Sequence, residues 1–328
     1  MTVLVLTNRL DPTADRVIKG LRARAVGVVR LDPGDLPEGV AIEAEHSGRA
    51  WRGRIFTAHH SVLVDDITAV YVRRPNSPRV LGSPTDPDAY RTYQWAAREN
   101  HEGLYGVLFG LPGVRWANRP DRNRTAGLKG YQLATAAACG FAVPPTLFGN
   151  TVSGARRFVG AQGEAVYKPL RGAPERGGWQ AMALYTRAVS TAELDESVRG
   201  AVCQFQRRIR PRYEARVTVV GDRVFTARLD SPTADGAVDW RQYQGTDQLV
   251  TTLIDTPAGL ARSIHRYMRV MGLNYGCFDF MVDAADRWWF LECNPSGQYL
   301  GVENETGAPV TRAVVDWLAG APGAGARN

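Results

Sequence analysis

The sequence predicts an α/β protein that continues into α+β architecture, and three observations support this fold class. Strand-like and helix-like segments alternate over the first third of the chain, which is typical of a small α/β unit. Strand-like segments joined by hairpin turns dominate the last third and indicate an antiparallel sheet. The 328 residues, 44% of them hydrophobic, are ample for two or three domains. We therefore expect three units, at residues 1–115, 116–200 and 201–328.

The overall composition argues against several classes of protein. No run reaches the 18 or so apolar residues of a membrane span, and the N-terminus shows no signal-peptide pattern. The four cysteines form no CxxC pair and lie in apolar segments, so we expect reduced core residues and a cytoplasmic protein. The net charge of +7 suits an acidic peptide, a nucleotide or nucleic acid. Because no zinc finger or RNP-type motif is present, we do not expect nucleic acid as a partner. Because no long apolar run is present, we do not expect a membrane either.

In the first unit, buried strands alternate with an amphipathic helix and a hairpin. Neither GxGxxG nor GxxxxGK[ST] is present, so neither a dinucleotide fingerprint nor a P-loop is indicated. The expected elements are strands at 3–6, 27–31 and 67–72, a helix capped by Thr13 or Asp15, a hairpin at 40–57 that turns at Ser47-Gly48, and a helix at 86–109 interrupted near Gly103 and Gly106.

The second unit contains a helix at 121–139 that carries Lys129, a short helix at 153–160, and a strand at 165–169 with a buried-looking Lys168. A glycine-rich loop at 171–178 follows. Such a loop leaves backbone N–H groups free to meet phosphate oxygens, although a hairpin tip would have the same composition.

The third unit begins with strands at 202–209, 213–220 and 223–230, with Gly221-Asp222 as a hairpin turn. Helices are expected at 256–271 and 308–318. Between these helices lies a hairpin with strands at 275–283 and 287–293, whose connecting loop places Asp283 opposite Trp288.

The same register sets two carboxylates side by side on this hairpin. Asp279 then lies opposite Glu292, and alternation along the strands brings Asn294 to their face. The opposite face would be apolar throughout, with Phe278, Phe280, Val282, Trp289, Leu291 and Cys293. Opposed Cβ atoms lie about 5 Å apart, so the two carboxylates repel unless a positive charge or a shared proton intervenes. A nearby arginine would satisfy them, as would Mg²⁺ held by two carboxylates and an amide.

Lysine is scarce in this chain. Of 40 lysines and arginines only three are lysines, namely Lys19, Lys129 and Lys168. Where arginine is used so freely, a retained lysine suggests a need for a compact charge on a flexible stem. For Lys19, on the first helix, chance is a sufficient explanation.

These parts resemble an ATP-grasp enzyme in their order along the chain. That family has a lysine on a helix, a lysine on a strand, a glycine-rich flap, a strand that contacts adenine, an arginine on a strand, a late Asp, and an E-x-N triplet. The matching residues are Lys129, Lys168, residues 171–178, residues 204–209, Arg216, Asp279, and Glu292-Cys293-Asn294. Two of the three lysines therefore fall on family positions.

The resemblance is closer to the ATP-grasp ribosomal peptide maturases, the microviridin-type ligases or graspetide synthetases. It extends from about residue 3 to residue 318. One departure is Arg207, where the family commonly has Glu. The stretches that carry the resemblance are VYVRRP (70–75), WANRP (116–120), PPTL (144–147), YKPL (167–170), EARVTVVG (214–221), VDWR (238–241) and NPSGQY (294–299).

The resemblance implies an ATP-grasp fold with an N-terminal pre-ATP-grasp α/β domain, a central domain and a C-terminal antiparallel-sheet domain. ATP and Mg²⁺ would be its cofactors. Arg216 and Lys168 would be catalytic, and Asp279, Glu292 and Asn294 would bind the metal. ATP would contact Lys129, Lys168, Gln206, Arg207, Ile209 and Glu214.

The implied substrate is a ribosomal precursor peptide with a leader and an acidic core. Arg73, Arg74, Asp239 and Arg241 are candidate contacts to it, although a solvated basic face would look the same. The activity would join Asp or Glu side chains to Ser or Thr hydroxyls, or to a Lys amine. Two alternatives are a ligase that joins small carboxylates and amines, and a nucleotide-binding regulator without turnover. Linkage, ring pattern and oligomeric state, including a homodimer or homotetramer, are left open.

Overall fold

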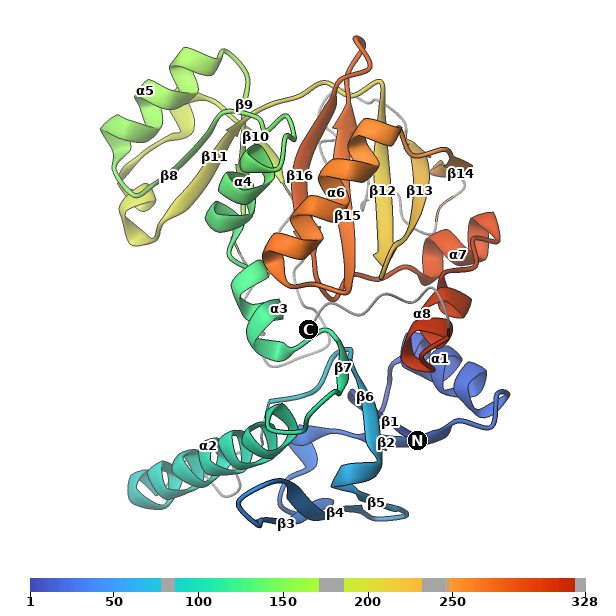
Figure 1. Ribbon diagram of the computed structural model, residues 1–328. Helices are drawn as coiled ribbons and strands as arrows, with labels where there is room; N and C mark the ends of the chain where they lie inside the picture. The colour runs from blue at the N-terminus through green and yellow to red at the C-terminus, as the bar shows by residue number, and fades with distance from the viewer. Residues whose placement is uncertain (78–85, 171–185, 232–245, 247, 322–328) are drawn as a thin grey trace.

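The computed structural model describes residues 1–77, 86–170, 186–231, 246 and 248–321, and these residues form four sheets (Figure 1). The first sheet is parallel, has the order β2-β1-β6-β7, and confirms the three strands expected in the first unit. Its strands are β1 (Thr2–Leu6), β2 (Gly27–Leu31), β6 (Ile67–Val72) and β7 (Arg115–Ala117).

The expected hairpin at 40–57 is confirmed as β3 (Val40–His46) and β4 (Trp51–Thr57), which β5 (Ser61–Leu63) extends into a small sheet. Two helix predictions need correction. Helix α1 (Pro12–Arg22) is capped by Asp11, whose carboxylate accepts from the backbone N–H groups of Thr13 and Ala14. Helix α2 (Pro87–Phe109) is continuous, because its two internal glycines have open space around them and helical neighbours on both sides.

The central sheet is antiparallel, with the order β10-β9-β11-β8. In place of the single helix expected at 121–139, two helices meet just before Lys129, which becomes the first residue of the second helix. The elements are α3 (Pro120–Ala126), α4 (Lys129–Ala138), β8 (Thr146–Gly149), α5 (Val152–Gln162), β9 (Ala165–Lys168), β10 (Arg187–Val189) and β11 (Cys203–Arg207). The loop at 171–178 lies outside the described residues.

The C-terminal sheet is antiparallel, with the order β14-β13-β12-β15-β16. Strands at 213–220 and 223–230 are confirmed with the expected bounds. The elements are β12 (Tyr213–Val220), β13 (Arg223–Asp230), β14 (Val250–Ile254), α6 (Ala258–Met271), β15 (Tyr275–Val282), β16 (Trp288–Asn294), α7 (Leu300–Thr306) and α8 (Val310–Leu318).

One face of the C-terminal sheet is apolar and lies under α6, as Figure 1 shows. Alternation along β12 and β15 sends Val217 and Phe278 into this core, where they meet Tyr267 and Met268 of α6. Helices α3 and α4 contribute Ala126, Leu133 and Ala136 to the same core. The opposite face of the sheet is thereby left for polar side chains.

The N-terminal sheet and the C-terminal sheet share a second core. Helix α1 packs against α8, and Val17 and Leu21 lie in one cluster with Val314 and Trp317. Such contacts between the first and last tenths of the chain fix the two units against each other. Among the described residues, no helix combines the length and the apolar character that crossing a bilayer would require.

Candidate functional site

The hairpin β15–β16 places Asp279 directly opposite Glu292, as the sequence predicts. The register shifts after this pair, because Leu291 is an extra residue on β16 and forms a β-bulge. Beyond the bulge, Val282 lies opposite Trp288, so the expected pairing of Asp283 with Trp288 is wrong. The bulge also reverses the faces of the strand end. Phe290 enters the apolar core, and Leu291 and Trp289 lie with Met281 on the other side.

Arg216 forms a buried ion pair with Asp279 across β12 and β15. The two residues are cross-strand partners, and the guanidinium Nη1 donates to Asp279 Oδ1 over 2.5 Å. Their side chains are 7% and 6% exposed. Burial alone would lower the pKa of Arg216, but the charge of Asp279 outweighs it and raises the pKa. The positive charge of Arg216 therefore reduces the repulsion that the sequence predicts between Asp279 and Glu292.

Lys129 provides the second positive charge. It stands at the start of α4, and its ammonium donates to Glu292 Oε2 over 2.6 Å. Both side chains are about a quarter exposed, so this pair faces solvent more than the Arg216 pair does. One acid of the hairpin therefore has a fixed, buried partner, whereas the other has a partner on a flexible stem.

Asn294 lies at the end of β16, where its side-chain oxygen accepts from the backbone N–H of Ser296 over 2.9 Å. The described residues hold no group of three or more His, Cys, Asp or Glu side chains that could bind a metal by themselves. A cation at this hairpin would use Asp279, Glu292 and the Asn294 amide, with further oxygens from outside the protein. Mg²⁺ commonly binds in this way, through one or two carboxylates and substrate phosphates.

A pocket between the central sheet and the hairpin gathers four of the predicted nucleotide contacts. It is lined by Lys168 at the end of β9, by Gln206 and Arg207 of β11, and by Ile209. Met281 and Leu291 close it from the C-terminal sheet. Gln206 is buried and donates to Thr146 over 2.9 Å. An apolar wall with a few polar groups and one ammonium suits a flat, anionic ligand such as a nucleotide.

Glu214 lies outside the lining of this pocket, and Arg207 packs against its wall. Glu214 of β12 is the cross-strand partner of Met281, so it lies on the same face of the sheet as Arg216. The guanidinium of Arg207 lies 4.9 Å from the ring centre of Trp289, and that of Arg287 lies 4.1 Å from the same ring centre. Arg207 therefore stacks on the pocket wall, which gives this position a packing role in place of the Glu common in the family.

The candidate peptide contacts separate into three cases. Arg73 is only 2% exposed and donates to the backbone of residues 296 and 297, so a direct contact with a peptide is not supported. Arg74 is exposed, and partial desolvation together with the charge of the neighbouring Arg73 lowers its pKa. Asp239 and Arg241 lie outside the described residues.

Two buried amides that the sequence analysis did not single out also hold the hairpin. Gln132 of α4 both donates to and accepts from the backbone of Cys293, next to Glu292. Asn118 accepts from the N–H groups of Asn274 and Tyr275 and donates to the carbonyls of Tyr275 and Pro295. An amide next to the run of alanine, leucine and threonine in α4 was the available signal for Gln132. Asn118 lies inside the WANRP stretch that carries the family resemblance.

Comparison with known proteins agrees with this geometry. Residues 2–124 match the family model of the MvdD pre-ATP grasp domain. The sequence matches no curated protein. Among solved structures, the macrocyclase MdnC of Microcystis aeruginosa, bound with its precursor peptide MdnA, has a TM-score of 0.84 and 26% identity, over 98% of this chain and 100% of that one. The macrocyclase MdnB of the same organism has a TM-score of 0.79 and 28% identity, over 97% and 98% of the two chains.

A third structure extends the likeness in fold. The RiPP-associated ATP-grasp ligase of Chryseobacterium gregarium, in complex with ADP and a leader and core peptide, has a TM-score of 0.87 over 100% of this chain and 99% of that one, at 24% identity. With the site described above, these findings define the chain as an ATP-grasp ligase. Within that class it is similar to the peptide macrocyclases MdnC and MdnB, which agrees with the resemblance seen in the sequence.

Proposed function

We propose that this protein is an ATP-dependent macrocyclase that acts on a ribosomal precursor peptide with a leader and an acidic core. It would activate Asp or Glu side chains as acyl phosphates and join them to Ser or Thr hydroxyls, or to a Lys amine. One observation carries the proposal. A single sheet face holds Arg216, Asp279 and Glu292 beside the pocket lined by Lys168 and Gln206, in a chain that matches two macrocyclases over almost its whole length.

The pocket residues would bind and orient the nucleotide. Gln206 and Ile209 would border the adenine, Lys168 and Lys129 would contact phosphates, and Glu214 would reach the ribose. Because Lys129 now contacts Glu292, arrival of a phosphate would give its ammonium a second anionic partner. The three expected units, residues 1–115, 116–200 and 201–328, would then divide the labour, with the nucleotide between the second and the third.

The reaction is a phosphoryl transfer, which depends mainly on positioning and charge neutralisation. A carboxylate oxygen of the peptide bonds to the γ-phosphorus of ATP, and ADP leaves. A hydroxyl or amine then bonds to the acyl carbon, phosphate leaves, and the attacking group loses its proton. Arg216 would neutralise the charge on the transferred group. Bound Mg²⁺, held by Asp279, Glu292 and Asn294, would supply further neutralisation at the phosphates.

The net result sets the experiment. The purified protein, ATP, Mg²⁺ and a leader-bearing precursor peptide, to be sought among the genes next to its own, should yield a peptide lighter by one water for each bond formed. ADP and phosphate should appear at least one-for-one with the water lost. Tandem mass spectrometry should place the links between side chains and leave the C-terminus of the peptide free.

Two further measurements complete the test. Hydroxylamine or mild base opens esters and leaves amides, so it identifies the linkage. Fragments that show an added amino acid without loss of water would instead support a ligase for small carboxylates and amines. A nucleotide-binding regulator would produce no ADP in the presence of the peptide.

A further inference from the structure

Residues 295–298, which directly follow the hairpin, form a segment that we call the carbonyl loop. Each of its four consecutive backbone carbonyls accepts a hydrogen bond from a side chain of a different part of the fold. Buried carbonyls need such partners, so the loop is held at every residue. The donors are Asn118 to Pro295 (2.9 Å), Arg73 to Ser296 (2.5 Å), the Tyr275 hydroxyl to Gly297 (2.6 Å), and Arg216 to Gln298 (3.2 Å).

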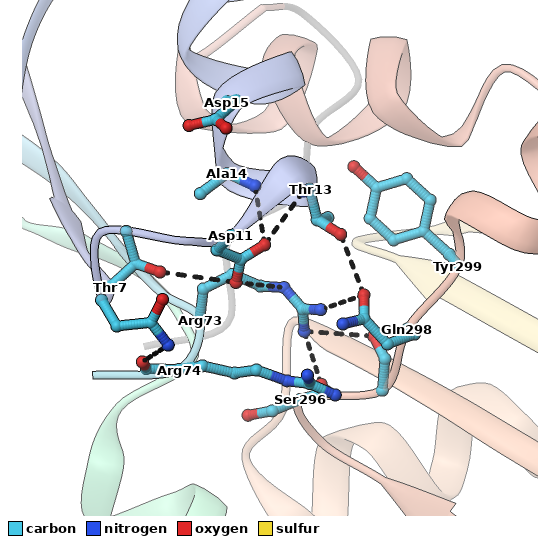
Figure 2. A network of polar contacts seen from close by, with 12 residues as sticks. Thr7, Asp11, Thr13, Ala14, Asp15, Arg73, Arg74, Ser296, Gln298 and Tyr299 are labelled. Atoms are coloured by element: carbon cyan, nitrogen blue, oxygen red, sulfur yellow. Dashed lines mark hydrogen bonds and ion pairs between the residues drawn. The ribbon is translucent and has the colours of Figure 1, made fainter. Parts of the chain in front are cut away.

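Among the residues of the N-terminal unit, Arg73 makes the most hydrogen bonds to the carbonyl loop. It follows β6, and its Nη1 donates to the carbonyls of Ser296 and Gly297. Its Nη2 donates to Gln298 Oε1 over 2.5 Å, as Figure 2 shows. A planar guanidinium can reach two acceptors at once in this way, whereas an ammonium cannot reproduce the fork.

Asp11 supports Arg73 from behind. Its Oδ2 lies 3.6 Å from Arg73 Nε, and both side chains are 1% exposed. Its Oδ1 caps helix α1 by accepting from Thr13 and Ala14 (Figure 2). The Thr13 hydroxyl in turn donates to Gln298 Oε1 over 2.9 Å. Thr13, at the start of α1, and Arg73 therefore both donate hydrogen bonds to the side chain of Gln298.

The other side of the carbonyl loop faces the reactive residues. Arg216 bonds both Gln298 and Asp279. A Cβ added to Gly297 would lie 2.9 Å from Arg216 Nη2 and 2.5 Å from the Cβ of Cys277, so the backbone lies directly against the arginine. The first residues of the loop also fix Asn294, whose side chain accepts from the N–H of Ser296.

We propose that Arg73 is a positioning residue. By fixing the carbonyl loop, it sets the orientation of Arg216 and of the Asn294 amide, and it makes the geometry of the reacting groups depend on the N-terminal unit. The inference rests on the proposed function for its catalytic consequence, but its structural part does not. It also replaces the direct peptide contact that the sequence suggested for Arg73.

The main test compares Arg73→Lys with Arg9→Lys, an arginine of the same unit that is 79% exposed. Arg73→Lys keeps the charge beside Asp11 but loses the fork. We expect kcat for peptide cyclisation to fall about 10–100-fold, as for other residues that orient reactive groups. KM for ATP should stay within about twofold of the wild type, because the pocket lies against the central sheet. Arg9→Lys should change neither value.

A second variant guards against loss of folding. The pair Asp11→Asn with Arg73→Gln removes both buried charges together and keeps an asparagine, which is a good N-cap. This double variant should fold, show helical circular dichroism like the wild type, and still lose kcat.

Hydrogen exchange provides a measurement that needs no turnover. The N–H groups of Ser296 and Gly297 both bond to Asn294, and they should exchange faster in Arg73→Lys than in the wild type. Unchanged exchange together with unchanged kcat would overturn the proposal. A higher KM for the peptide with unchanged kcat would also overturn it, in favour of a direct peptide contact. If the wild type cyclises no peptide, the proposed function fails while the exchange result still decides the role of Arg73.

Discussion

The C-terminal sheet meets the rest of the molecule at two junctions that differ in construction. Toward the N-terminal unit, a cluster of twenty buried residues runs from β1 and α1 to α8 within the described chain. Toward the central sheet, the corresponding cluster of described residues has three buried members, Ile209, Met281 and Trp289. The first junction also contains the buried ion pairs and the carbonyl loop, whereas the second contains the pocket.

This difference separates two requirements of a ligase. Groups that neutralise developing charge work best when they are held still before the reaction. A nucleotide site must instead admit and release its ligand, and junctions between domains are common places for such sites. Arg216 lies near the larger junction, toward the N-terminal unit, which we call the rigid junction. The pocket residues lie at the smaller junction, toward the central sheet.

The largest effect is expected from weakening the rigid junction at Asp279. In Asp279→Asn, the buried Arg216 loses its counter-charge, and product formation should fall about a hundredfold or more. The free energy of unfolding should also fall, by about 3 kcal/mol, because one charge of a buried pair is left alone. Steady-state kinetics and urea unfolding measure the two effects.

The matched control is Asp286→Asn, at the exposed turn of the same hairpin, where Asp286 pairs with Arg212 at the surface. This change should be nearly neutral. A folded Asp279→Asn protein with turnover near that of the control would show that Asp279 is not part of the reactive site.

An intermediate effect is expected at the pocket. Lys168→Arg keeps the charge but replaces a compact ammonium with a planar fork, so nucleotide affinity should fall about tenfold, which corresponds to roughly 1.4 kcal/mol. Calorimetry with ADP and Mg²⁺ measures it, and Lys19→Arg, on the exposed side of α1, is the control. Equal affinities for the two variants would mean that Lys168 does not contact the nucleotide.

The smallest effect is expected at the rim of the rigid junction, where Asp316 of α8 pairs with Arg24 and with Arg223 (2.6 Å). Burial would raise the pKa of Asp316, but hydrogen bonds from both arginines outweigh it and lower the pKa. A lowered pKa stabilises the fold above the pKa of the unfolded state, about 3.9, and this stabilisation is lost as the pH falls through the folded-state value.

Asp316→Asn should therefore lower the free energy of unfolding by about 1 kcal/mol at pH 7, and the difference from the wild type should shrink below about pH 4. Urea unfolding at several pH values measures it. Asp15→Asn, which breaks an exposed pair with Arg30, should show a smaller difference. A difference for Asp316→Asn that is constant with pH would exclude an electrostatic origin.

The strands of the C-terminal sheet and the facing pair Asp279 and Glu292 could be predicted from the sequence because side-chain alternation is local. The bulge at Leu291 could not, because Leu291 fits either face and only packing against Met281 and Ile209 decides between them. The break before Lys129 was missed although a local signal was present, since Gly127, which ends α3, has a low helix propensity.

Arg73 shows the limit of sequence reasoning more clearly. Two adjacent arginines after a buried strand look alike in the sequence, yet Arg73 is buried and Arg74 is exposed. Their difference arises from a loop more than two hundred residues away. The sequence analysis allowed for an arginine beside Asp279 but did not identify it as Arg216, because the pairing of β12 with β15 is not local.

The carbonyl loop has a consequence for engineering by domain exchange. Its donors come from the residue after β6, from the residue after β7, from β12 and from β15, so no single unit carries the whole set. A chimera that took its first 115 residues from a relative would keep the loop but replace Arg73, Asp11 and Thr13 together. Such an exchange would transplant a working enzyme only where the donor chain brings an arginine and a hydroxyl to the same acceptors, the carbonyls of Ser296 and Gly297 and the side chain of Gln298, and an acid behind that arginine.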